Sequence, residues 1–125
     1  LFTAIHESGL IHRRQIGGGP GRGLFQIETA THTDIQRYLN QVAKPSLKNA
    51  VNSLKTPGKS DSWNLEYNDA YGAALARIRY TWAKEALPNM KDLKKVSEYW
   101  GKYYNTRNEA AKNAKFVRDV QNCYN

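Results

Sequence analysis

The sequence predicts an all-α fold organised as one domain over residues 1–125. Apolar residues recur at three- and four-residue spacing along most of the chain, as they do on the buried face of a helix. Prolines and glycines separate these periodic segments, and no segment alternates apolar and polar residues as a half-buried strand does. A chain of 125 residues can bury one hydrophobic core but not two.

Three helices are predicted in the first half of the chain. The first covers about residues 1–8 and ends at Gly9, the second is capped by Thr31 and stopped by Pro45, and the third is capped by Ser46. The apolar stripe of the second helix consists of Ile35, Tyr38, Leu39 and Val42. The stripe of the third consists of Leu47, Ala50, Val51 and Leu54.

The second half is predicted to contain a loop at residues 56–62 and then three more helices. The longest covers about residues 64–86 and is ended by Pro88. Its stripe consists of Tyr71, Ala74, Leu75, Ile78, Trp82 and Ala83. The next helix is marked by Leu93, Val96, Trp100 and Tyr103. A capping box at residues 106–109 predicts a last helix that contains Ala110, Ala114, Val117 and Val120.

Nineteen Lys and Arg residues against eleven Asp and Glu give a net charge of +8, which favours a polyanionic partner such as nucleic acid or the acidic bacterial envelope. The basic residues are scattered along the chain, which argues against a dedicated DNA-binding surface. The one cysteine, Cys123, excludes an internal disulfide, and no apolar run is long enough to span a membrane. Because the chain begins at Leu1 without a methionine, we expect it to be part of a longer protein.

Two carboxylates flank a loop with five glycines in seven residues, at positions 17–23. Glu7 lies at the end of the first apolar segment, and Glu28 lies just beyond the loop. Glycine lets the backbone adopt positive φ and approach a ligand closely. With Phe2, Ile5, Leu10 and Ile11 as neighbours, we expect Glu7 to be partly desolvated, with a raised pKa. This arrangement indicates acid/base chemistry on a polar substrate.

Several motifs resemble those of one enzyme family. Glu7-Ser8-Gly9, followed sixteen positions after the glutamate by Gly23-Leu24-Phe25-Gln26-Ile27, resembles the Glu-Ser and Gly-Leu-Met-Gln-Ile signature of the soluble lytic transglycosylases, relatives of goose-type lysozyme. Thr29-Ala30 extends the match, and Gln-Ile-Glu in place of Gln-Ile-Met-Pro is similar to phage-encoded, virion-associated members. Residues 68–74 are similar to the family's central helix, in which a glycine allows close packing.

A last motif lies near the end of the chain. Tyr104-Asn105 resembles the Tyr-Asn of the family's Ala-Tyr-Asn-Ala-Gly element, where the tyrosine lies beside the catalytic glutamate. Thr106 and Arg107 replace the Ala-Gly that follows in the family.

The resemblance implies a lysozyme-like fold and cleavage of the β-1,4 bond between N-acetylmuramic acid and N-acetylglucosamine in peptidoglycan. Glu7 would be the general acid and then the base that yields a 1,6-anhydro product. Ser8 and Gln26 would position the sugar or the glutamate, and Tyr104 would support Glu7. The groove would also involve Gly23, Leu24, Phe25 and Asn105. No metal or cofactor is expected. The implied setting is the bacterial cell wall, reached from a virion or by secretion, with peptidoglycan glycan strands and the other domains of a larger virion protein as partners.

Five alternatives are weighed against this prediction. Glu28 is either a second catalytic carboxylate, which would make the protein a muramidase-type hydrolase, or a charge at the start of the next helix. A catalytically silent peptidoglycan-binding or virion structural module would have the same fold without the enzymatic activity. A basic nucleic-acid binder would leave the glycine loop unexplained. A phosphate-binding loop lacks the required Gly-Lys-Ser or Gly-Lys-Thr, and a zinc-protease helix would need a histidine where Leu10 stands.

Overall fold

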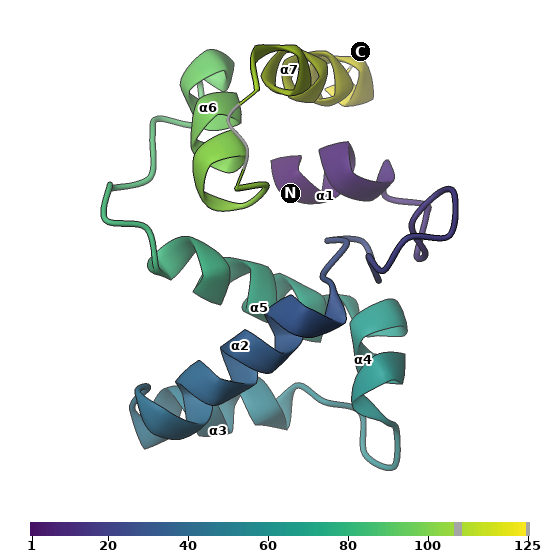
Figure 1. Cartoon of the computed structure of the whole chain (residues 1–125), viewed down its shortest axis with the longest axis vertical. Helices are drawn as coiled ribbons and strands as arrows, with labels where there is room; N and C mark the ends of the chain where they lie inside the picture. Colours follow the sequence, from purple (N-terminus) through teal and green to yellow (C-terminus); the bar gives the residue numbers. More distant parts are fainter. Residues whose placement is uncertain (107–108, 125) are drawn as a thin grey trace.

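The computed structural model describes residues 1–106 and 109–124 of the chain. Within these residues it is an all-α single domain of seven helices with no sheet (Figure 1). The helices are α1 (Phe2–Ser8), α2 (Thr29–Gln41), α3 (Pro45–Ser53), α4 (Asp61–Tyr67), α5 (Asp69–Thr81), α6 (Leu93–Tyr103) and α7 (Ala110–Tyr124). None of the described helices is long and apolar enough to cross a lipid bilayer.

The core consists of two apolar clusters that meet along α5. One cluster, from α2 to α5 and the segment before α2, contains Ile27, Ile35, Leu39, Val51, Leu65, Tyr71, Leu75 and Ile78. The other, from α1, α5, α6 and the end of the chain, contains Ile5, Ala76, Val96, Trp100, Tyr104, Phe116 and Val120. Figure 1 shows the same division, with α1, α6 and α7 above and α2 to α5 below. The half-buried Phe25 packs against both clusters, so the segment before α2 lies where they meet.

The first helix has the predicted bounds because glycine ends it. Gly9 adopts a left-handed conformation with φ of 60°, and its N–H donates to the carbonyl of Ile5. This geometry satisfies a carbonyl at the end of α1 and turns the chain away from the helix axis. The prediction for the helix that follows residue 92 is also confirmed, since α6 spans Leu93–Tyr103.

The predicted starts of α2 and α3 were wrong by three and two residues, respectively. The backbone of Glu28 is extended, and its carbonyl accepts from the His32 N–H, so α2 begins at Thr29 and Thr31 lies inside it. Pro45 is the first residue of α3, where a fixed φ and a missing N–H suit a helix start, so Lys44 stands at the cap position predicted for Ser46. Four predicted stripe residues of these two helices are exposed, namely Val42, Leu47, Ala50 and Leu54.

The predicted long helix over residues 64–86 is wrong, because it consists of two helices joined at Asn68. The backbone of Asn68 leaves the helical region with ψ of 95°, and its side-chain oxygen accepts from the Tyr71 N–H and caps α5. Its side-chain nitrogen donates to the Leu54 carbonyl over 2.7 Å, which ties the break to the end of α3. The helix also ends early, at Thr81, and Trp82 is exposed.

Two further predictions concern the loops. The loop predicted at residues 56–62 is shorter, because the Ser60 hydroxyl accepts from the Trp63 N–H and α4 begins at Asp61. The capping box predicted at residues 106–109 includes Arg107 and Asn108, and the departure at Arg107 from the family's Ala-Gly also falls there. Both residues lie outside the described part of the chain.

Candidate functional site

Glu7 occupies the last turn of α1 and is half-buried against α6. The indole Nε1 of Trp100 donates to Glu7 Oε1 over 2.9 Å. Burial raises the pKa of Glu7, while the smaller effects of the Trp100 hydrogen bond and the charge of Arg79 lower it. A carboxyl group in this environment holds its proton to higher pH than an exposed one, as a general acid requires.

The apolar neighbours predicted for Glu7 were partly wrong. Leu10 and Ile11 follow the turn at Gly9 and are 40% and 75% exposed, so they do not desolvate the carboxylate. Glu7 is desolvated instead by aromatic side chains, those of Trp100 in α6 and of Tyr104, the residue after α6. Trp100 is 3% exposed, and burial followed by the nearby charge of Glu7 raises the pKa of Tyr104 well above its ordinary value. Helices distant in sequence therefore create the environment of Glu7.

Trp100 is itself held from the opposite side by the neighbour of Glu7. The His6 ring lies edge-on to the Trp100 ring, with centroids 4.4 Å apart, and His6 Nδ1 is 2.7 Å from Asp119 Oδ2 of α7. Phe116 packs against both rings. These contacts fix the indole so that its N–H points at Glu7, and they make Trp100 a positioning residue that motif comparison did not identify.

We expect Trp100→Phe to raise the pKa of Glu7 further. The indole N–H stabilises the ionised carboxylate, so its removal favours the protonated form. The Glu7 side-chain carboxyl carbon, followed by NMR through a pH titration, measures the shift. Trp63→Phe is the matched control, because Trp63 packs against Tyr67 of α4, outside this cluster. An unchanged Glu7 pKa in a folded Trp100→Phe protein would contradict this role.

The Gly-Leu-Phe-Gln turn is closed by backbone hydrogen bonds on both sides. Arg22 and Ile27 exchange two N–H···O bonds of 3.1 and 3.0 Å, and the Gly23 N–H donates to the Arg13 carbonyl over 2.7 Å. Gly23 has φ of 72°, and a Cβ added there would overlap the Leu65 carbonyl oxygen. Only glycine fits this position, so the turn packs directly against the backbone of α4.

Gln26 lies at the end of that turn and faces the same space as Glu7. Its side-chain nitrogen donates to the carbonyls of Gly23, over 2.9 Å, and of His12, over 3.3 Å. Its own φ is 50°, a left-handed value that L-residues adopt only when their surroundings hold them there. The amide is therefore a fixed group on the wall of the site.

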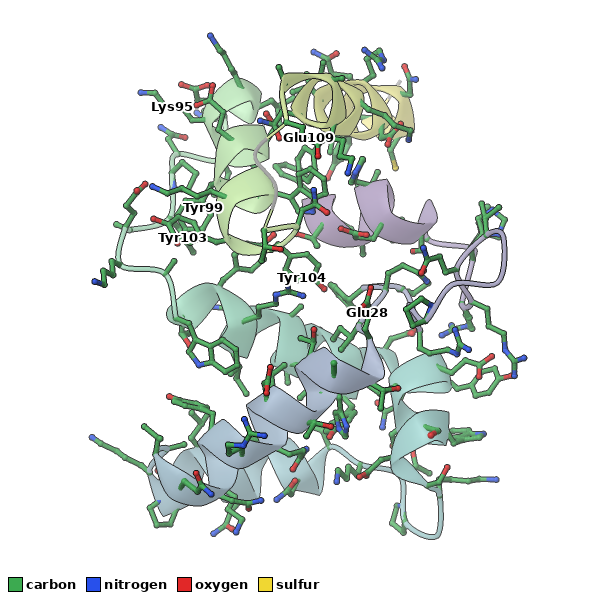
Figure 2. All side chains as sticks on the ribbon, viewed as in Figure 1. Glu28, Lys95, Tyr99, Tyr103, Tyr104 and Glu109 are labelled. Carbon is green, nitrogen blue, oxygen red and sulfur yellow. The ribbon has the colours of Figure 1, made fainter. Side chains whose placement is uncertain are left out.

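Tyr104 joins the end of α6 to the turn. Its hydroxyl donates to the Phe25 carbonyl over 2.6 Å, and its ring stacks on Tyr80 with centroids 5.2 Å apart. The Phe25 ring in turn packs on Gly72, where an added Cβ would lie 3.2 Å from a ring carbon. Tyr104 is thus near Glu7, as predicted, but its hydroxyl holds the turn. Figure 2 places Tyr104 and Glu28 in the central region where α6 faces the start of α2.

A polar groove of about 300 Å³ brings four of the predicted site residues together. They are Glu7 from α1, Gln26 from the turn, Glu28 from the start of α2 and Asn105 from the end of α6. The other lining residues are His12, Arg14, Gln15 and Ile16, from the loop after α1. Sequence reasoning did not assign these four, and only their position between the two carboxylates could have indicated them.

Glu28 is exposed at the mouth of this groove. It occupies the cap position of α2, yet its side chain makes no capping hydrogen bond there. The carboxylate lines the same space as Glu7. Its position fits both predicted roles, a second catalytic group and a favourable charge at a helix N-terminus.

The remaining predicted residues form the framework of the groove. The Ser8 hydroxyl is buried, donates to the Ala4 carbonyl and accepts from the Leu10 N–H, so it stabilises the end of α1. Gly23, Leu24 and Phe25 belong to the turn behind Gln26 and are not lining residues of the groove. In this structure, Ser8 and Phe25 therefore support Glu7 and Gln26 from behind.

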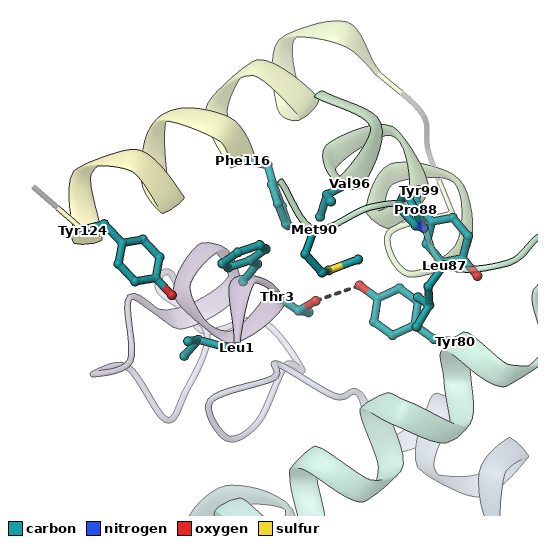
Figure 3. Close-up of a pocket in the computed structure, with 11 residues that line it drawn as sticks. Leu1, Thr3, Tyr80, Leu87, Pro88, Met90, Val96, Tyr99, Phe116 and Tyr124 are labelled. Carbon is teal, nitrogen blue, oxygen red and sulfur yellow. Dashed lines mark hydrogen bonds between the residues drawn. The ribbon is translucent and has the colours of Figure 1, made fainter. Parts of the chain in front are cut away.

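A larger cavity of about 430 Å³ lies on the other side of α1 and is apolar (Figure 3). Leu1, Thr3, Tyr80, Met90 and Phe116 are among its lining residues, and no carboxylate is. The Thr3 and Tyr80 hydroxyls are hydrogen-bonded to each other over 2.7 Å. Of these two spaces, the smaller groove is therefore the one that carries groups for acid/base chemistry. In the part of the chain that the structure describes, no cluster of three His, Cys, Asp or Glu side chains could hold a metal ion.

The fold and site define an all-α, single-domain protein with a half-buried carboxylate in a polar groove. Comparisons with models of known families, with curated proteins and with solved structures find no match.

Proposed function

We propose that this protein cleaves peptidoglycan as a lytic transglycosylase with a lysozyme-like fold. The observation that carries the proposal is the groove in which Glu7, Gln26, Glu28 and Asn105 meet. Glu7, Gln26 and Asn105 were selected by resemblance from three separate motifs, and nothing in the spacing of those motifs along the chain requires them to meet. The net charge of +8 supports an acidic envelope as the setting, reached from a virion or by secretion.

In the proposed reaction Glu7 acts first as an acid and then as a base. Protonated Glu7 gives its proton to the glycosidic oxygen, and the bond from that oxygen to C1 of the muramoyl sugar breaks. The carboxylate then takes the proton of the muramoyl 6-hydroxyl, whose oxygen bonds to C1 and closes the 1,6-anhydro ring. Burial supports the acidic form, and the Trp100 N–H supports the carboxylate that follows.

The groove provides polar groups for the sugar beside Glu7. Gln26 and Asn105 both line it, and side-chain amides are suited to hydrogen-bond hydroxyl and N-acetyl groups. Arg14 also lines the groove while it is paired with Glu66 over 2.7 Å, so its cation is fixed at the rim.

A muramidase-type hydrolase is the second candidate, because Glu28 lines the same groove. In inverting glycosidases the second carboxylate activates water from about 6.5–9.5 Å away. The exposure of Glu28 favours the transglycosylase. A carboxylate that is exposed to solvent does not hold one water molecule in place for attack on the sugar. The muramoyl 6-hydroxyl is already bound in the groove and therefore reacts first.

We expect wild-type digests of purified peptidoglycan to contain 1,6-anhydro-muramoyl ends, measured by mass spectrometry of the released muropeptides. Glu28→Gln should leave this product unchanged and lower the rate less than tenfold, since only one carboxylate transfers protons. Glu98→Gln, at an exposed position of α6, is the matched control for charge. Reducing muramic acid ends that disappear in a folded Glu28→Gln protein would establish the hydrolase instead.

A further inference from the structure

A third and smaller cavity, of about 210 Å³, lies next to the Glu7 groove. It is lined by Thr31, Asp34, Arg79, Trp82, Ala83, Tyr103 and Thr106. Glu28 lines the groove and Thr31, one turn further along α2, lines this cavity. Asn105 lines the groove and its neighbour Thr106 lines the cavity. The same two segments therefore border both spaces, and the cavity continues the groove towards the end of α5.

Trp82 gives this cavity an apolar face. The side chain follows the last residue of α5 and is 42% exposed. Its ring lies edge-on against Tyr38 of α2, with centroids 5.6 Å apart and planes at 72°. This contact fixes the orientation of the indole without burying it. An aromatic ring that is fixed in orientation and half-exposed in a mainly apolar cavity suits the apolar face of a pyranose ring.

Arg79 gives the cavity its positive charge. Its guanidinium lies 4.7 Å from the centroid of the Tyr104 ring, on the side chain that also braces the Gly-Leu-Phe-Gln turn. Among the described residues no carboxylate forms an ion pair with Arg79. The one carboxylate of this cavity, Asp34, pairs instead with Arg37 over 3.1 Å. The guanidinium is thus available to an anionic group of a ligand.

We propose that this cavity is a second saccharide subsite, in which the next sugar of the glycan strand stacks on Trp82 and presents a carboxylate-bearing substituent to Arg79. The proposal rests on the proposed function for the identity of the strand. Thr31 and Thr106 offer hydroxyl groups to the sugar, and Asp34 offers an acceptor. Figure 2 labels Tyr103 and Glu28, which line the cavity and the groove respectively.

The test measures binding without turnover, in a Glu7→Gln background, by calorimetry. Two probes are used: a muramoyl-containing tetrasaccharide with free carboxylates and the neutral tetramer of N-acetylglucosamine. We expect Trp82→Ala to weaken both probes about fivefold to tenfold, because stacking does not depend on charge. We expect Arg79→Gln to weaken only the anionic probe, with a loss that shrinks at high salt. Trp63→Ala, which removes an indole from α4, should change neither.

Equal affinities in the Trp82→Ala and Trp63→Ala proteins, or no binding of either tetramer, would overturn the subsite. A second measurement needs no aromatic substitution: the Trp82 indole N–H resonance should shift on titration with the neutral tetramer, and the Trp63 resonance should not. The proposed function is judged separately, by the muropeptides that the wild-type protein releases. Binding at Trp82 without any released muropeptide would leave the subsite standing and reject the catalytic assignment.

Discussion

Replacement of Glu7 by glutamine is expected to lower peptidoglycan lysis by at least about two orders of magnitude, because the amide has no proton to transfer. The fold should be retained. Glutamine has nearly the volume of glutamate, and its side-chain oxygen can still accept from the Trp100 indole. Clearing of purified cell walls measures the rate, and far-ultraviolet circular dichroism verifies the helices. The loss would then belong to the chemical step.

Glu28→Gln is the matched control for this prediction, since it makes the same chemical change in the same groove. Under the proposed mechanism Glu7→Gln removes the activity and Glu28→Gln retains most of it. Near-wild-type clearing by a folded Glu7→Gln protein would reject Glu7 as the acid. The pH profile gives a further readout. Because Glu7 must be protonated at the start, activity should fall as the pH rises through its raised pKa.

The end of α1 and the position of Glu7 could be predicted because both depend on local signals. Gly9 ends the helix by its own backbone freedom, and Glu7 lies two residues before it. The burial of Glu7 was also anticipated, although its cause was not. Leu10 and Ile11 are close to Glu7 in sequence but are exposed, whereas Trp100 contacts Glu7 from the other end of the chain. The contact between Trp100 and Glu7 could have been anticipated only from the need of a buried indole N–H for an acceptor.

The break at Asn68 could not be predicted from periodicity, because apolar residues continue at helical spacing on both sides of it. The signal was the residue type: asparagine caps a helix by accepting a backbone N–H, and it does so here for Tyr71. A contact with α3, distant in sequence, completes the break through the Leu54 carbonyl. Local capping chemistry and tertiary contact together override a continuous apolar stripe.

The convergence of Glu7, Gln26, Glu28 and Asn105 depends on packing that no local pattern contains. It requires Tyr104 to hold the Phe25 carbonyl and Gly23 to lie against the Leu65 carbonyl. The motif residues therefore fall into two groups. Some line the groove, and others, such as Gly23 and Tyr104, keep its walls together. The second group is best tested through stability.

Gly23→Ala is expected to destabilise the protein by about 3 kcal/mol or more, since the new Cβ would overlap the backbone of Leu65, which cannot move aside as a flexible side chain can. Gly58→Ala is the matched control: Gly58 has a similar φ of 75°, but nothing lies within 4 Å of an added Cβ. It should cost only the left-handed strain, about 1–2 kcal/mol.

Urea unfolding of both variants measures the difference. Equal losses of unfolding free energy in Gly23→Ala and Gly58→Ala would show that the turn is not in close contact with the backbone of α4. The larger loss at Gly23 should also appear in function. The only relief for the overlap is to move the turn away from α4, and that movement carries Gln26 off the wall it shares with Glu7. Folded Gly23→Ala protein should therefore lyse cell walls more slowly than wild type, and Gly58→Ala should not.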